Sequence, residues 1–115
     1  MDIIYDACAG LDVHKESVSV CVRRLDASGQ SVTEVREFRT VTVGILQLGD
    51  WMESHKVRHV AMESTGVYWK PIWNLLEDRF ELMLCNARDV RNVPGRKTDT
   101  RDCQWLAQLL QHGLL

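Results

Sequence analysis

The sequence predicts one α/β domain with a mixed five-stranded sheet and flanking helices, on the basis of three observations. The chain has 115 residues, 45% of them apolar and 26% charged, which is enough apolar content for one buried core. Its first third contains three strand-like segments in succession. The remainder alternates helical with strand-like periodicity, which gives the order β, β, β, α, β, α, β, α.

The first three predicted strands are joined by short connections. Residues 3–13 are apolar or small, as in a strand buried on both faces. Residues 17–23 alternate valine with serine or cysteine, the period-two pattern of a strand with two different faces. After a turn at residues 26–29, residues 32–38 suit a more polar strand at a sheet edge. We therefore expect these strands to pair antiparallel.

The remaining segments predict two crossovers and a closing helix. A short helix follows Thr42, a predicted N-cap, and a second helix carries an apolar stripe that includes Trp69 and Trp73, which we expect to pack in the core. The other expected segments are strands at 57–62 and 80–85, a polar, basic loop at 86–98, and a helix at 99–112 that ends at Gly113. This order is the layout of the ribonuclease H-like superfamily.

Composition excludes several classes of protein. With 14 basic and 16 acidic residues the net charge is −2, so nucleic-acid binding must be sought in local patches. The four cysteines form no CxxC pair, which favours buried, reduced thiols over a disulfide or zinc site. Asp2 and Asp6 flank a short apolar stretch that is typical of neither a signal peptide nor a membrane span. We expect a cytoplasmic protein without a membrane partner.

Two acidic residues follow apolar strands. Asp12 comes at the end of the first predicted strand and Glu63 directly after the fourth. Open α/β sheets place ligand sites at the carboxyl ends of parallel strands, so both acids stand where a functional site is expected. Taken singly, each acid is better explained as a solvated turn residue, and it is the occurrence of both after parallel strands that favours a site.

Two further acids stand at the start of the last predicted helix. Asp99 and Asp102 are at i and i+3, so on a helix they would project from one face. Five cations surround them in the sequence, a pattern that suits a metal held among phosphates: Arg88, Arg91, Arg96, Lys97 and Arg101. Lys15 is a further candidate phosphate contact. The alternatives are that the acids only cap the helix and that the basic run is a solvated loop.

Four carboxylates suit one chemistry in particular. Two hard divalent ions, one activating the attacking oxygen and one stabilising the leaving oxygen, need oxygen ligands and open coordination positions for phosphate. Aspartate and glutamate supply such oxygens, whereas histidine and cysteine favour softer metals. The four acids therefore indicate phosphodiester chemistry with Mg²⁺, for which Mn²⁺ would substitute.

Three segments together resemble a known family. They are Gly10–Lys15 (GLDVHK), Met62–Trp69 (MESTGVYW) and Val93–Asp102 (VPGRKTDTRD). In order and approximate spacing they resemble the DEDD transposases of the insertion-sequence one-ten family, which includes the Piv-type DNA invertases. The resemblance covers essentially the whole chain.

The resemblance implies a RuvC-like catalytic domain over residues 1–115, with Asp12, Glu63, Asp99 and Asp102 binding magnesium. Family members are similar in having a separate C-terminal domain with a catalytic serine, and in using a structured bridge RNA to pair donor and target DNA. We therefore expect a fragment without that second domain, with DNA and a guide RNA as partners. The apolar residues at the C-terminus lead us to expect a homo-oligomer: Leu109, Leu110, Leu114 and Leu115.

Two alternatives remain open at this point. Actin-like and sugar-kinase folds also begin with an aspartate after a buried strand, but they need glycine-rich phosphate loops, and here His14-Lys15-Glu16 follows Asp12. A non-catalytic RNA- or DNA-binding module would use the basic segment from Arg88 to Arg101 without any metal.

Overall fold

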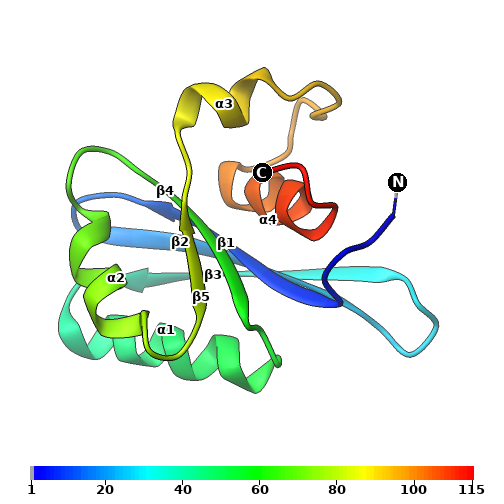
Figure 1. Cartoon of the computed structure of the whole chain (residues 1–115). Helices are drawn as coiled ribbons and strands as arrows, with labels where there is room; N and C mark the ends of the chain where they lie inside the picture. The colour runs from blue at the N-terminus through cyan, green and yellow to red at the C-terminus, as the bar shows by residue number, and fades with distance from the viewer. Residues whose placement is uncertain (1) are drawn as a thin grey trace.

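The computed structural model describes residues 2–115. Its strands form one sheet in the order β3-β2-β1-β4-β5, with helices against both faces (Figure 1). The strands are β1 (Ala7–Val13), β2 (Ser17–Leu25), β3 (Ser31–Arg39), β4 (His59–Ser64) and β5 (Glu81–Leu84). The helices are α1 (Thr42–Ser54), α2 (Trp69–Leu76), α3 (Ala87–Asn92) and α4 (Asp102–Gln111).

The sheet is mixed. β2 lies antiparallel to both β1 and β3, whereas β4 is parallel to β1 and β5 is parallel to β4. Two hairpins therefore come first, and α1 and α2 lie in the two connections that lead to β4 and β5. This arrangement confirms the predicted fold class, a mixed α/β sheet with flanking helices.

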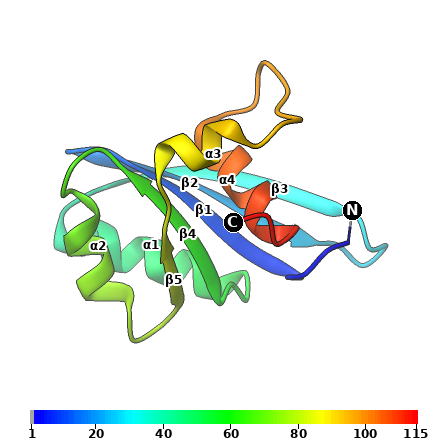
Figure 2. The same ribbon diagram turned by 45° about the horizontal axis from the view of Figure 1, so that its top comes forward.

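The two faces of the sheet carry different layers, because successive residues of a strand point to opposite sides. Leu11 and Val13 of β1 belong to a core shared with α1 and α2, whereas Cys8 packs against α4 (Figure 2). The α1/α2 core includes fully buried apolar side chains: Ile45, Leu48, Met52, Met62, Ile72 and Leu76. Trp69 and Trp73 pack against this core, as predicted.

Gly10 lets α4 approach the sheet closely. A Cβ atom at this position would lie 2.5 Å from the Cys103 carbonyl oxygen and 2.6 Å from the Ala107 nitrogen. Only a glycine permits this backbone contact between β1 and α4. Since Gly10 and Asp12 are two residues apart, they share the face of β1 that α4 covers. The contact therefore sets the height of α4 above the first acid.

The N-terminal segment differs from the prediction. β1 begins at Ala7, not at Ile3, because Ile4 and Tyr5 bond to the end of α4 and, of residues 3–6, only Asp6 still bonds to β2, through Leu25. The backbone nitrogens of Ile4 and Tyr5 both donate to the Gln111 carbonyl oxygen, at 2.8 and 3.4 Å. The apolar composition of residues 3–6 does not show whether their backbone pairs with a neighbouring strand or with the end of a helix.

The predicted basic loop contains a short helix, α3. Asn86 is its N-cap and its side chain accepts a hydrogen bond from the Arg88 backbone nitrogen at 2.8 Å. Val90 is the one buried residue of α3, so the apolar periodicity that reveals longer helices is missing.

Two helix starts also differ from prediction. α1 begins at Thr42 with Val41 as its N-cap, so Thr42 is not the cap. α4 begins at Asp102, not at Asp99, because the Arg101 backbone nitrogen donates to Gln104 Oε1 at 3.0 Å, an N-terminal capping contact. Thr98 and Asp99 form a turn before the helix.

All four cysteines are free, and the predicted burial holds for Cys8, Cys21 and Cys103 but only in part for Cys85. Cys8 and Cys21 lie in the sheet and Cys103 in α4, and burial raises the pKa of the Cys8 and Cys21 thiols to about 12. Within residues 2–115, none of the helices has the length and apolar character needed to cross a membrane.

Candidate functional site: an acidic cluster at the end of the sheet

Asp12 and Glu63 lie side by side. They are register partners on the parallel strands β1 and β4, near the ends of both strands. Their neighbours Leu11 and Met62 belong to the opposite core, so both acids stand on the α4 face. The Asp12 side chain is 19% exposed, and its Oδ2 lies 3.0 Å from His14 Nε2.

Asp102 brings a third carboxylate from α4. Burial raises the pKa of Glu63, and the negative charges of Asp102 and Asp12 raise it further, in that order. The charges of Arg91 and Arg96 oppose this rise. Glu63 therefore lies within electrostatic reach of both aspartates. We call Asp12, Glu63 and Asp102 the acidic cluster.

Arg96 is bonded to the acidic cluster. Its Nη2 donates to Asp102 Oδ1 at 2.8 Å and to the Thr100 carbonyl oxygen at 2.6 Å. The Asp102 side chain is 55% exposed and that of Arg96 is 32% exposed. The ion pair thus engages an oxygen of Asp102 at the first turn of α4.

Asp99 lies apart from the other three predicted acids. It lines a polar groove of about 250 Å³ together with Arg23, Thr33, Thr100, Gln104 and Gln108. Because α4 begins three residues later, Asp99 and Asp102 do not share a helical face, and the i, i+3 geometry expected from the sequence is wrong. Within residues 2–115, no three acidic, histidine or cysteine side chains stand close enough together to form a ready-made metal site.

The predicted phosphate-binding cations are all exposed. They lie in the β1–β2 connection, on α3, and in the segment between α3 and α4: Lys15, Arg88, Arg91, Arg96, Lys97 and Arg101. Figure 2 shows α3 and the following segment beside the N-terminal end of α4. Arg91 and Arg96 are the two whose charge acts on Glu63.

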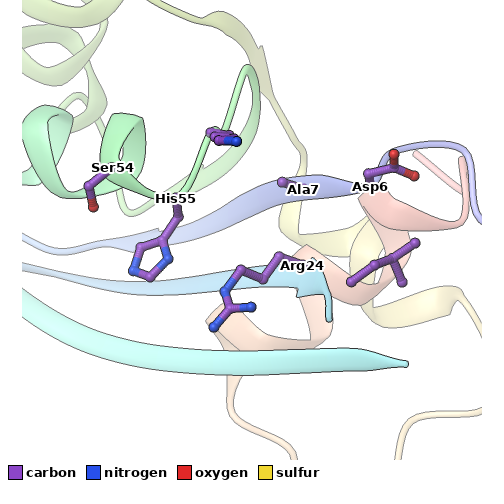
Figure 3. Close-up of a pocket in the computed structure, with 7 residues that line it drawn as sticks. Asp6, Ala7, Arg24, Ser54 and His55 are labelled. Atoms are coloured by element: carbon purple, nitrogen blue, oxygen red, sulfur yellow. The ribbon is translucent and has the colours of Figure 1, made fainter. Parts of the chain in front are cut away.

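A separate hollow of about 560 Å³ lies at the other end of β1. Asp6, Ala7, Arg24, Leu25, Ser54, His55 and Lys56 line it. Figure 3 shows Arg24 extending from β2 and His55 from the end of α1 toward this hollow. Ala7 begins β1 whereas Asp12 is near its end, so the hollow is distinct from the acidic cluster.

Sequence reasoning missed Gln111, which holds the far end of α4. The residue is fully buried, and its Oε1 accepts hydrogen bonds from Arg23 Nε at 2.5 Å and Ser31 Oγ at 3.0 Å. The available signal was one polar side chain within the apolar stripe of a predicted helix. These bonds tie α4 to β2 and β3, and so help to position Asp102 at its other end.

Two solved structures show a distant likeness to this chain. No curated protein matches the chain significantly in sequence. The chain is 11% identical to a solved structure of the Aquifex aeolicus member of the Ppx/GppA family, with a TM-score of 0.48 over 73% of this chain and 36% of that one. For the type II variant of the Aquifex aeolicus Ppx/GppA phosphatase the values are 13%, 0.45, 76% and 38%. The chain spans little more than a third of the length of these two structures.

One family match covers almost the whole chain. Residues 9–115 match the family described as "Transposase", the DEDD transposases of the IS110 type. The matched range contains β1 with Asp12, β4 with Glu63, and α4 with Asp102. The chain therefore belongs to the IS110-type DEDD family of transposases.

Proposed function

We propose that this chain is the RuvC-like, metal-dependent catalytic domain of an insertion-sequence transposase and acts on phosphodiester bonds of DNA. The observation that carries the proposal is the pairing of Asp12 with Glu63 on parallel strands, with Asp102 of α4 within electrostatic reach of Glu63. In the full-length protein, a second domain with a catalytic serine and a guide RNA complete the reaction.

The chemistry of the acidic cluster fits Mg²⁺ or Mn²⁺. Carboxylate oxygens are the ligands that these hard ions prefer. The mutual repulsion that raises the pKa of Glu63 would be relieved by a divalent cation placed between the acids. Asp12, Glu63 and Asp102 would hold the metal, and when bound it supplies charge stabilisation for the phosphoryl oxygens.

Asp99 would act as a further metal ligand if α4 became one turn longer at its start. The turn at residues 98–99 is separated from α4 only by Thr100 and the extended Arg101, so one more helical turn at the start of α4 would place Asp99 next to Asp102 on the same face. We propose that metal binding favours this longer helix and makes Asp99 the fourth ligand.

The exposed cations around the acidic cluster supply phosphate contacts in this proposal. The charges of Arg91 and Arg96 reach Glu63, while Lys15, Arg88, Lys97 and Arg101 are further exposed cations. Such contacts fix the nucleic-acid backbone relative to the acids without reading sequence. DNA is the partner expected of a transposase, and the guide RNA would share this surface.

The direct test is calorimetric titration of Mn²⁺ into the purified chain. We expect Asp12→Asn and Asp102→Asn each to weaken binding, because each removes a negatively charged oxygen ligand, by about 10-fold or more. Asp78→Asn is the matched control, since Asp78 is an exposed acid after α2, outside the acidic cluster. Equal Mn²⁺ affinity in all four proteins would refute the assignment.

A second candidate function is nucleic-acid binding without catalysis. The ion pair between Arg96 and Asp102 favours it, because it engages one of the acids with a side chain of the same chain. Two results together would support this candidate. The wild-type chain would bind no Mn²⁺, and a variant with all four acids replaced by amides would still bind DNA with a strong dependence on salt.

A further inference from the structure

We propose that Arg96 is an internal competitor for metal: its guanidinium holds Asp102 and must leave before that carboxylate binds a cation. The inference rests on the proposed function, because it concerns the same acidic cluster. It assigns Arg96 a second role besides phosphate contact, namely control of when the site becomes able to accept metal.

The contacts of Arg96 give the first argument. One nitrogen, Nη2, bonds to both Asp102 Oδ1 and the Thr100 carbonyl oxygen. The carbonyl is part of the backbone just before α4, so it fixes the guanidinium in front of the helix end. A cation that binds Asp102 Oδ1 competes with this hydrogen bond, because the positively charged guanidinium already lies 2.8 Å from that oxygen.

The position of the charge gives the second argument. The guanidinium of Arg96 is paired with Asp102 at 2.8 Å, and its positive charge also reaches Glu63. Arg91 also acts on Glu63 but forms no ion pair with an acid within residues 2–115. Arg96 therefore combines the local field with direct occupation of a carboxylate.

The chemistry of arginine explains how the exchange would proceed. A guanidinium keeps its charge at any ordinary pH, so Arg96 cannot leave Asp102 by losing a proton. Its departure is favoured when another anion accepts it, and phosphate is the anion whose oxygens match the guanidinium fork. Metal loading and phosphate binding then assist each other, as thermodynamic linkage requires of two coupled sites.

The first test measures Mn²⁺ affinity by calorimetry in the absence of nucleic acid. We expect Arg96→Gln to bind Mn²⁺ about two- to fivefold more tightly than wild type, the range that a partly exposed ion pair gives. Lys97→Gln is the matched control, because it removes the same charge from the next residue, which forms no ion pair within the described residues. Equal tightening in both variants, or none in Arg96→Gln, would overturn the proposal.

The second test follows the arginine side chains by NMR during titration with Mg²⁺. The Arg96 Nε–H signal is expected to shift as its guanidinium leaves Asp102. The Arg79 signal serves as an internal reference, because Arg79 pairs with Glu53 and Asp50 at 2.7 and 2.8 Å, away from the acidic cluster. An unmoved Arg96 signal at saturating Mg²⁺ would overturn the proposal.

The two proposals fail in different ways. If Asp12→Asn weakens Mn²⁺ binding while Arg96→Gln leaves it unchanged, the acidic cluster binds metal and Arg96 does not compete. If the wild type binds no Mn²⁺ and Arg96→Gln binds none either, the proposed function itself is wrong.

Discussion

Glu63 is the acid whose surroundings disfavour its charge. Burial and two neighbouring aspartates raise its pKa above the ordinary value of 4.5, so the folded chain holds the Glu63 proton more tightly than the unfolded chain does. The resulting stability is fully present below pH 4.5 and is lost as the pH rises through the raised pKa. At neutral pH and without metal, the ionised Glu63 therefore destabilises the fold.

This sign leads to a prediction for Glu63→Gln. In the presence of a chelator the variant is expected to unfold at a higher temperature than wild type at about pH 7, and the difference should shrink below about pH 4. Thermal unfolding followed by circular dichroism at both pH values measures it. Glu77→Gln, an exposed glutamate after α2, provides the comparison. A Glu63→Gln chain that is less stable than wild type at neutral pH would contradict the sign.

At this scale, the sequence predicted the two acids of the sheet better than those of the last helix. Asp12 and Glu63 follow from strand ends, because parallel pairing brings successive strand ends together. The placement of Asp99 depended on where α4 begins. A capping contact between Arg101 and Gln104 decides that start, and helical periodicity does not reveal it.

Among the elements, α4 and β1 form the contact on which the site depends. Gly10→Ala would add a methyl group against the Cys103 carbonyl oxygen and the Ala107 nitrogen, both backbone atoms of α4. We expect a loss of about 1–3 kcal/mol of unfolding free energy, because a helix must shift to relieve the clash. Urea unfolding measures the loss. A Gly10→Ala chain as stable as wild type would show that α4 is seated differently.

Among the predicted elements, β1, β2 and α1 each contain several buried apolar residues. β3 and β5 were also predicted, although neither contains a fully buried residue. α3 was not predicted because it has six residues and buries only Val90. Its signal is local, an asparagine N-cap followed by Asp89 in the first turn.

For the whole molecule, the order of elements along the chain was enough to predict a mixed sheet. The order of the strands within the sheet became known only from the structure, because it depends on which strands pair in space.

The predicted self-association through the last helix needs correction. Leu109 and Leu110 are 1% and 4% exposed and belong to the core beneath α4, so they are not available to a second copy. Leu114 and Leu115 are exposed and line a groove of about 230 Å³ with Met83 and Leu84. The expected homo-oligomer stays a prediction, and of the four leucines only Leu114 and Leu115 are exposed enough to take part in it.

Sedimentation velocity tests this prediction. The apparent mass of the wild type is expected to rise with protein concentration, and Leu114→Ser should shift the rise to about fivefold higher concentration because it removes buried apolar area from the interface. Val43→Ser, an exposed apolar residue on α1, is the control. A wild-type chain that stays monomeric over the whole range would exclude the interface.

The tight seat of α4 on Gly10 has a consequence for evolution and engineering. Asp12 and Glu63 belong to the sheet and Asp102 to α4. Their spacing is therefore determined by the main-chain contact between Gly10 and α4, and not by the acids themselves. The spacing of the three acids can therefore be changed by substitutions in β1 where α4 packs on it, while every carboxylate is retained.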